Sequence, residues 1–390
     1  MNKRFALTGA LALGLSLGAI AQNPVQVKYA NTITAEDLKE YLTFLASDEM
    51  KGRDTGSPEG LIASNYLADF YKSLGLTGPV DGSYFQAVPL VSSKFDKVTL
   101  QVGKSKLVEN EDFVFVGDAN MKKASKTELV FLGLVNDENL AKVDVKGKLV
   151  GIWAVGERSN NLLNAVMDAG AAGAVIVTME GQANFDRIAN RYKSLAGRGR
   201  VGFDQATNQR PVFMVSSEKM GELFGTPVDV LKEAAKSNPS SIKSQKASYQ
   251  VVKDKTPLEA YNVLGFLEGT DKKEEVLVIS SHYDHVSSTG EVFNGADDDG
   301  SGTVSVMEIA EAFATAAKEG HRPRRSILFL NVTGEEKGLL GSQHYSENPI
   351  FPIANTVNNI NIDMVGRIDY EYQNAENKDY VYVIGSEMLS

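Results

Sequence analysis

The fold is decided by the stretch from Val276 to Arg367, where apolar runs end in acidic residues or histidine: EVLVIS leads into SHYDH (281–285), SILFLNVTG leads into Glu335–Glu336, and VNNINID ends at Asp363. Short β-branched and aliphatic runs bounded by turn signals are typical of buried strands. A further segment, NGADDDGSG (294–302), opens a predicted helix. In an open α/β sheet, ligand-binding and catalytic groups gather beyond the carboxyl ends of the strands. The sequence therefore predicts an α/β fold with a polar site along one sheet edge.

This edge is predicted to be a metal site. The expected strand ends deliver five polar side chains to it, namely His282, Asp297, Glu335, Glu336 and Asp363. One histidine with several carboxylates and no cysteine is a ligand set for divalent metal, including two ions that share a carboxylate. Taken singly, each acidic residue is more often a solvated loop residue. Their joint placement at successive strand ends favours the metal site.

The histidine and the aspartates can divide the work of binding metal. His282 and Asp284 are two residues apart at a strand end and so lie on the same side of the backbone. One arrangement has His282 bind metal through one nitrogen while Asp284 accepts the other N–H. Asp297, Asp298 and Asp299 precede a helix, where the dipole tolerates negative charge. We select Asp297 as the bridging ligand and expect Asp298 and Asp299 to turn outward or cap the helix.

The two adjacent glutamates are expected to differ in role, because neighbouring side chains cannot easily make the same contact. Glu336 would bind metal, and Glu335 would stay free as a general base that takes a proton from water and passes it to a leaving amine. The other histidines are assigned no role. His285 is expected to point elsewhere, and His344 is expected to pack on a helix or lie at the surface.

Composition limits the other classes of function. The chain has 390 residues, which suggests two domains, and its content of 43% hydrophobic and 23% charged residues is ordinary for a globular protein. The formal net charge of −10 argues against nucleic acid or anionic membrane as a partner. There are no cysteines, which excludes disulfides, thiolate nucleophiles and cysteine-ligated zinc.

The N-terminus predicts export. Asn2–Arg4 is a short basic region, Phe5–Leu17 is apolar, and Ala19–Ala21 reads as a cleavage site. The apolar run is shorter than a membrane-spanning helix, which disfavours the alternative of a membrane anchor. Residues 1–21 are therefore predicted to be a signal peptide of a periplasmic or secreted protein. No later stretch approaches the length of a membrane span.

The remaining chain divides into an interrupted main domain (22–103 and 251–390) and an inserted module (104–250). The module alternates strand-like runs with polar segments and contains no histidine. Two helices are predicted in the first part of the main domain, the earlier one capped by Thr34, with a turn-rich loop around Arg53 between them. Arg53 is read either as a surface loop residue or as a structural salt-bridge partner near the crevice.

The motifs SHYDH, NGADDDGSG, TGEEKGLLGS and NIDMVGR, in this order, resemble the M28 family of zinc aminopeptidases. LASDEMKGRDTGSPEG and LADFYKSLGL resemble the opening helices of that family, and DVKGKLVGI with AGAAGAVIV is similar to the protease-associated (PA) domain that is often inserted in it. The resemblance implies a phosphorylase/hydrolase-like α/β/α sandwich with an inserted, smaller PA-type domain.

The resemblance also implies two zinc ions and a set of roles. His282 and Asp363 would bind one ion, Glu336 would bind the other, and Asp297 would bridge them. Glu335 would be the base, supported by Asp284, and a cis peptide bond would join Asp297 to Asp298. The family pattern needs a second histidine ligand well after the Asp363 motif, and no histidine follows His344. We therefore expect the sequence to be truncated at its C-terminus.

The predicted function is that of an exported zinc aminopeptidase that hydrolyses the N-terminal residues of peptides. Two alternatives stay open. A glutaminyl-cyclase-like acyl transferase would use the same fold with one zinc ion. A non-catalytic, receptor-like binding protein would keep the architecture but is expected to have lost its ligands, whereas the residues named above are all in place.

Overall fold

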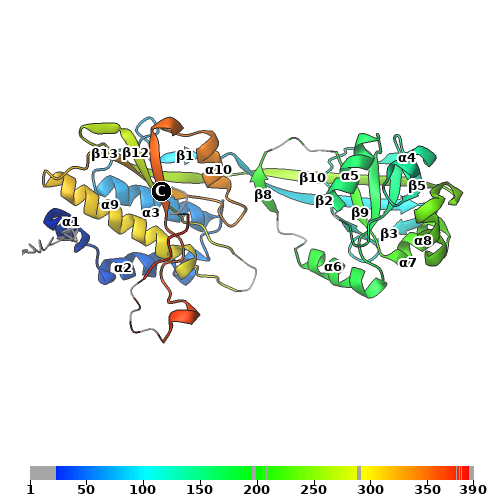
Figure 1. Ribbon diagram of the computed structural model, residues 1–390, viewed down its shortest axis with the longest axis horizontal. Coiled ribbons are helices and arrows are strands. Elements are labelled where there is room, and N and C mark those ends of the chain that lie inside the picture. Colours follow the sequence, from blue (N-terminus) through cyan, green and yellow to red (C-terminus); the bar gives the residue numbers. More distant parts are fainter. Residues whose placement is uncertain are drawn as a thin grey trace, which may run out of the picture. The chain divides into compact units, whose positions relative to one another are not determined.

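The computed structural model describes residues 23–385, apart from 158, 196–198, 205, 207–208, 288–290, 375, 377 and 379. The predicted signal peptide, residues 1–21, lies outside the described residues. The chain forms two compact units (Figure 1). The first unit contains the residues up to Val88 and those from Ala260 onward, and the second contains Pro89–Glu259. None of the helices in the described part of the chain has both the length and the hydropathy that crossing a membrane requires.

The first unit is built on a five-stranded sheet with the order β1-β11-β13-β12-β14. Its strands are β1 (Phe85–Ala87), β11 (Tyr261–Leu267), β12 (Lys272–His282), β13 (Arg325–Val332) and β14 (Thr356–Asn361). β12 runs parallel to both β13 and β14, whereas β11 is antiparallel to β13 and β1 is antiparallel to β11. The three parallel strands therefore end at one edge of the sheet, as the sequence predicted.

Both faces of this sheet are apolar, which is why the centre of β13, residues 327–330, is a continuous hydrophobic run. Side chains alternate between the faces along a strand. Ile327 and Phe329 belong to the core on one face, and Leu328 and Leu330 belong to the core on the other. A sheet with two apolar faces needs helices on both sides, so this alternation produces the layered α/β arrangement.

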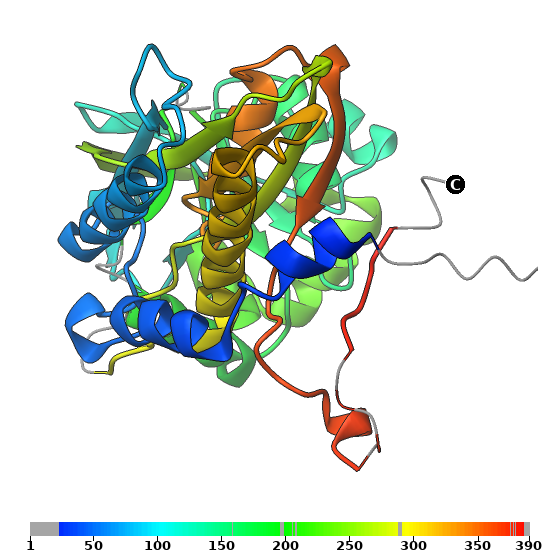
Figure 2. The same ribbon diagram turned by 90° about the vertical axis from the view of Figure 1, so that its left-hand side faces the viewer.

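Three helices pack against the first face: α2 (Ala35–Leu45), α3 (Pro58–Ser73) and α9 (Gly302–Lys318). A shorter helix, α1 (Pro24–Ala30), contacts α9. Figure 2 shows α9 in yellow-brown and the blue N-terminal helices on the same side of the sheet. On the second face, α10 (Leu340–Glu347) packs through Tyr345. The mixed α/β fold with helices on both faces agrees with the predicted α/β/α sandwich.

The helix starts follow their sequence signals. The Thr34 hydroxyl accepts the backbone N–H of Asp37 at 3.1 Å, which confirms the predicted cap of α2. Ser57 accepts the N–H of Gly60 at 2.9 Å at the start of α3, and Pro58 occupies the first helical position. The loop between the two helices contains the short turn η1 (Asp48–Met50) and Arg53.

The second unit is a separate α/β module around a nine-stranded sheet, ordered β3-β2-β10-β5-β6-β7-β9-β4 with β8 paired to β2. Its strands are β2 (Leu90–Val102), β3 (Ser105–Leu107), β4 (Val114–Phe115), β5 (Ser125–Gly133), β6 (Leu149–Trp153), β7 (Gly173–Val177), β8 (Arg200–Phe203), β9 (Val212–Met214) and β10 (Gln245–Leu258). Its helices are α4 (Asp137–Lys142), α5 (Ser159–Asp168), α6 (Gln182–Leu195), α7 (Ser217–Phe224) and α8 (Val228–Ser237), with the turn η2 (Pro239–Ser241).

This unit extends further along the sequence at both ends than the expected module of residues 104–250. The difference arises because β2 pairs with β10 over their length, from Leu90 opposite Leu258 to Val102 opposite Ala247. Both strands therefore belong to the inserted sheet and not to the main domain. Its likeness to a PA domain stays a prediction.

Buried polar groups join the layers of the first unit beneath the site edge. The hydroxyl of Tyr71 on α3 donates to the side-chain oxygen of Asn331 on β13, and the Asn331 amide donates to the Ser281 hydroxyl on β12 at 2.7 Å. All three side chains are fully buried. Leaving a buried acceptor unpaired costs free energy. These two hydrogen bonds therefore fix the position of α3 on β12 and β13.

We expect Tyr71→Phe to lower the free energy of unfolding by about 1–3 kcal/mol, because it leaves the Asn331 oxygen buried without its donor. Urea unfolding followed by circular dichroism measures the loss. Tyr66→Phe is the control, since Tyr66 lies on the same helix and its ring packs against Phe44. The control should change stability by less than about 0.5 kcal/mol, and equal effects of the two substitutions would contradict the assignment.

Candidate metal centre

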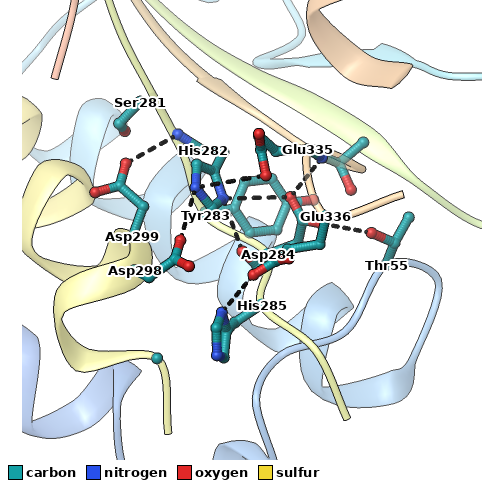
Figure 3. Close-up of polar contacts among 12 residues, drawn as sticks. Thr55, Ser281, His282, Tyr283, Asp284, His285, Asp298, Asp299, Glu335 and Glu336 are labelled. Carbon is teal, nitrogen blue, oxygen red and sulfur yellow. Dashed lines mark hydrogen bonds and ion pairs between the residues drawn. The ribbon is translucent and has the colours of Figure 1, made fainter. Parts of the chain in front are cut away.

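The candidate site lies beyond the carboxyl ends of the parallel strands. His282 ends β12, Glu335 and Glu336 follow β13, and Asp363 follows β14. The run of three aspartates lies in η3 (Ala296–Ser301), an irregular turn that leads into α9. The ends of β12, β13 and β14 and the turn η3 therefore converge at one edge of the sheet. Figure 3 shows the residues contributed by β12, by η3 and by the segment after β13.

Two groups of side chains place their nitrogen and oxygen atoms close enough to hold a metal ion. The first group consists of His282, Asp299 and Asp363, whose ligand atoms lie within 4.8 Å of one another. His282 is only 2% exposed, and its Nε2 atom lies 3.9 Å from Oδ1 of Asp363. The structure thus brings His282 and Asp363 together, as the sequence analysis expected.

The second group consists of His285, Asp298 and Glu336. Nδ1 of His285 lies 2.6 Å from Oε1 of Glu336, and both side chains are largely buried. The expectation that His285 points elsewhere was wrong. It assumed that the alternation of a strand continues after His282, but β12 ends at His282 and the chain turns there.

Asp298 connects the two groups. It belongs to the second group, yet its Oδ1 atom lies 3.2 Å from Nε2 of His282 in the first group. Its side chain is 40% exposed, so it faces the open side of the site. Asp298 is therefore a carboxylate that approaches both groups.

Asp297, the residue selected as the bridging ligand, is placed in neither group. Its Oδ1 atom accepts the backbone N–H of Gly366 at 2.9 Å and the Ser301 hydroxyl at 3.2 Å, which ties η3 to the segment after β14. The backbone of η3 is not helical at Asp298 and Asp299, so the three consecutive carboxylates point in different directions. The selection of Asp297 is corrected to Asp298.

The other expectations for this turn are also corrected. The cis peptide bond joins Asp298 to Asp299, one residue later than predicted. Asp299 caps α9 by accepting the N–H of Gly302 at 2.8 Å, as expected of a capping residue, but it is fully buried and does not turn outward. It also accepts the N–H of Met364 at 3.2 Å and that of His282 at 3.3 Å, so it links the ends of β12 and β14 to the start of α9.

Asp284 supports His282 through its backbone. Nδ1 of His282 lies 2.9 Å from the carbonyl oxygen of Asp284, whereas the carboxylate is 3.8 Å away. The contact expected of the Asp284 side chain is made by its backbone carbonyl instead, which fixes the ring so that Nε2 faces the site. The buried carboxylate instead accepts the Thr55 hydroxyl at 2.8 Å and the backbone N–H of Glu335 at 3.1 Å.

Burial and mutual repulsion make this cluster electrostatically strained. Burial raises the pKa of Asp299 to about 8, and it also raises the pKa of Asp363, helped by neighbouring Asp298 and Asp297. Burial lowers the tendency of His282 to protonate, but Asp284 and Asp299 outweigh it and its pKa is raised. A divalent cation would offset this repulsion. An imidazole with several carboxylates and no sulfur is also a donor set that zinc accepts, so the residues fit the metal.

Glu335 is the one glutamate at this edge that neither group includes. Its Oε2 atom lies 3.9 Å from Nε2 of His282. Burial raises its pKa above the ordinary value, and Glu336, Asp363 and Asp298 add to the rise while His282 opposes it. Glu335 also lines an open pocket of about 370 Å³ with His282 and Asp363 at its polar end and Leu330, Val332 and Tyr345 along its wall.

Sequence reasoning did not assign Asp298, Asp299, His285 or Thr55 to this site. Asp298 was available as one of three identical neighbours, and the sequence carries no signal that separates them. His285 had a usable signal, because a second histidine in the short segment SHYDH is unusual in a chain with four histidines. Thr55 had no local signal, since its partner Asp284 is 229 residues away in the sequence.

The model of peptidase family M28 matches residues 262–384. This segment belongs to peptidase family M28. Within the chain it contains β11 to β14 and every member of the two metal groups. The M28 segment therefore coincides with the part of the first unit that carries the candidate site.

Known proteins similar to the chain include zinc proteases and an aminopeptidase. A probable zinc metalloprotease of Pyricularia oryzae is 36% identical over 116 residues, which cover 28% of this chain and 22% of that protein. Aminopeptidase NAALADL1 of Rattus norvegicus is 35% identical over 105 residues, which cover 26% of this chain and 13% of that protein. The chain thus spans less than a quarter of the length of these relatives.

The solved structure of an aminopeptidase from Aneurinibacillus sp. strain AM-1 superposes with a TM-score of 0.52. The likeness covers 87% of this chain and 72% of that chain at 22% sequence identity. This likeness shows a shared fold.

We expect Asp298→Asn to weaken zinc binding by more than about tenfold, because it removes charge from the carboxylate that reaches both groups. Asp297→Asn is the matched control, since an amide oxygen can still accept the N–H of Gly366. Competition with a chromophoric chelator measures both affinities. A larger loss for Asp297→Asn than for Asp298→Asn would restore the original assignment of the shared ligand.

Proposed function

We propose that the protein is a zinc-dependent aminopeptidase that hydrolyses the N-terminal residues of peptides. The observation that carries the proposal is the arrangement of two metal-binding groups joined by Asp298, beside a glutamate that neither group uses. Membership of the M28 segment in a peptidase family and the aminopeptidase among the relatives support it.

His282 and Asp363 would hold one zinc ion, Glu336 and His285 would hold the second, and Asp298 would lie between them. When bound, the zinc pair supplies Lewis acidity that polarises the scissile carbonyl and lowers the pKa of water. The carbonyl of Asp284 holds the His282 ring in place. Asp299 accepts the backbone N–H groups of His282, Gly302 and Met364, and so holds the ends of β12 and β14 beside the start of α9.

Glu335 would act as the general base. Its backbone is fixed by the hydrogen bond to Asp284, while its side chain faces the pocket. The raised pKa brings this carboxylate closer to neutral pH, where a base can both accept a proton and give it up. Glu335 would take a proton from the attacking water and deliver it to the leaving amine.

The preference for N-terminal residues would come from the carboxylates on the open side of the site. Asp298 and Asp363 are 40% and 39% exposed, so they can face a substrate while contacting His282 on the other side. A carboxylate forms a charge-assisted hydrogen bond with a free ammonium group. A peptide whose N-terminus is blocked would lose this contact. Export to the periplasm or the medium, inferred from residues 1–21, belongs to the same proposal.

We expect Glu335→Gln to lower kcat on aminoacyl anilides by about 10²–10⁴-fold, the usual contribution of a general base, while zinc content stays unchanged. Glu40→Gln, on the exposed surface of α2, should leave both quantities unchanged. Release of the anilide group measures kcat, and metal analysis measures zinc. The wild-type activity should also disappear with a chelator and with an N-acetylated substrate.

Activity that survives chelation would overturn the zinc mechanism, and full activity of Glu335→Gln would overturn the assignment of the base. Cyclisation of N-terminal glutamine peptides without anilide release would favour an acyl transferase instead. Zinc binding with neither reaction would favour a receptor-like protein.

A further inference from the structure

A fully buried arginine lies beneath the candidate site. Arg53, in the loop between α2 and α3, has no exposed surface. Its guanidinium donates to backbone carbonyls: Nε to Tyr283 at 2.6 Å, Nη1 to Leu45 at 3.1 Å and Asn294 at 2.7 Å, and Nη2 to Gly295 at 2.6 Å. Three of these acceptors belong to the segments that carry His282 and Asp298.

These contacts differ from both sequence interpretations of Arg53. The residue is neither a surface loop residue nor a salt-bridge partner, since none of the ion pairs found among the described residues includes it. The planar guanidinium offers five N–H donors in a fixed geometry. Its geometry therefore sets the positions of the carbonyls that it binds, which a flexible ammonium group does less well.

The neighbours of Arg53 contact the same strand exits, and we call Gly52–Thr55 the brace. The carbonyl of Gly52 accepts the N–H of His285 at 3.0 Å. Asp54 forms an ion pair with Lys337 at 2.7 Å, just after Glu336. Thr55 donates to the carboxylate of Asp284 at 2.8 Å. The brace therefore reaches the exits of β12 and β13 as well as the entry to η3.

The backbone of the brace fits its contacts closely. Gly52 has a φ of +80°, and a Cβ atom there would lie 2.2 Å from the carbonyl oxygen of Val286 and 2.8 Å from that of Phe293. Arg53 has a φ of 45°, in the left-handed region that is unfavourable for a non-glycine residue. Such a conformation persists only where the surroundings fix it, and it is frequent at functional sites.

The charge of Arg53 also matches its surroundings. Burial lowers the pKa of Arg53 to about 10, while Asp284, Asp299, Asp298 and Glu336 oppose the decrease. The guanidinium therefore stays charged at neutral pH and offsets part of the repulsion among these carboxylates. It does so from behind the ligands, so it leaves the open side of the site to the metal and the substrate.

We propose that Arg53 is a positioning residue that holds the metal ligands at their binding distance before zinc arrives. By binding the carbonyls of Tyr283, Asn294 and Gly295, it fixes the spacing between the His282 and Asp298 segments. The inference rests on the zinc site of the proposed function but not on the reaction carried out there.

The direction in which zinc affinity changes when Arg53 is substituted distinguishes a positioning role from a purely electrostatic one. A buried positive charge repels a metal ion, so removing it would strengthen zinc binding if charge alone mattered. If Arg53 positions the ligands, its removal weakens zinc binding despite the loss of repulsion. Arg53→Lys keeps the charge and loses the planar geometry, and Arg53→Met loses both.

The experiment measures zinc affinity of purified metal-free protein by competition with a chromophoric chelator, and the absorption spectrum of the Co²⁺-loaded protein. We expect both Arg53→Lys and Arg53→Met to weaken zinc affinity by about 10–100-fold, as for other residues that orient metal ligands, and to alter the Co²⁺ spectrum. Arg324→Lys is the matched control, because Arg324 pairs with Asp271 on the exposed surface of the same unit. It should change neither quantity.

Thr55→Val provides a milder variant in case the Arg53 variants do not fold. It keeps the shape of the side chain and removes the hydrogen bond to Asp284, so zinc affinity should fall by a few-fold. Unchanged affinity in folded Arg53 variants would overturn the proposal, as would tighter binding by Arg53→Met alone. If only Thr55→Val folds, unchanged affinity in that variant overturns it.

Zinc binding and peptidase activity of the wild-type protein, measured separately, distinguish failure of this proposal from failure of the proposed function. Zinc binding without release of amino acids would overturn the peptidase activity and leave the role of Arg53 to be decided by the affinities. A wild-type protein that binds no zinc would overturn both.

Discussion

Parallel pairing of β12 with β13 and β14 is the constraint on which the site depends. Ser280 lies opposite Leu330 on one side and opposite Asn361 on the other, so the three strands end at nearly the same level. The residues that follow are then close in space although they are far apart in sequence. The two apolar cores keep the strands in this register, because a slip of one residue would move every side chain to the opposite face.

This convergence brings several carboxylates together, among which Asp284 and Asp299 are fully buried. The protein's own groups offset part of this negative charge. Asp299 accepts three backbone N–H groups, Asp284 accepts the N–H of Glu335 and the hydroxyl of Thr55, and Arg53 lies behind the cluster. Glu335 accepts fewer such hydrogen bonds and its side chain stays partly exposed, so its carboxylate can still accept a proton. The same fold thus produces both the crowded ligands and the free base.

The sequence predicted the features that depend on local pattern. The buried strands, the helix caps and the arrival of His282 and Asp363 at one edge follow from runs of apolar residues and their ends. It did not separate Asp297 from Asp298, because the choice depends on the irregular backbone of η3 and the residues themselves are identical. His285 was misplaced because strand alternation was extended past the end of β12.

The role of Arg53 was beyond local reasoning for a different reason. Its acceptors Tyr283 and Gly295 lie 230 and 242 residues further along the chain. They are also backbone carbonyls, which every residue has, so no sequence pattern marks them. The bounds of the inserted unit were misjudged in a related way, because the pairing of β2 with β10 joins its two ends across the whole insertion.

The long stretch of sequence between Arg53 and its acceptors has a consequence for the order in which they are synthesised. Ribosomes synthesise the brace first, then all of Pro89–Glu259, and only afterwards the strands that the brace holds. Closing so long a loop costs chain entropy. The β2–β10 pairing shortens it, and Val88 donates to the carbonyl of Ala260 at 2.9 Å where the insertion begins and ends. Every member of the two metal groups also follows Ala260, so these side chains are synthesised after both the brace and the insertion.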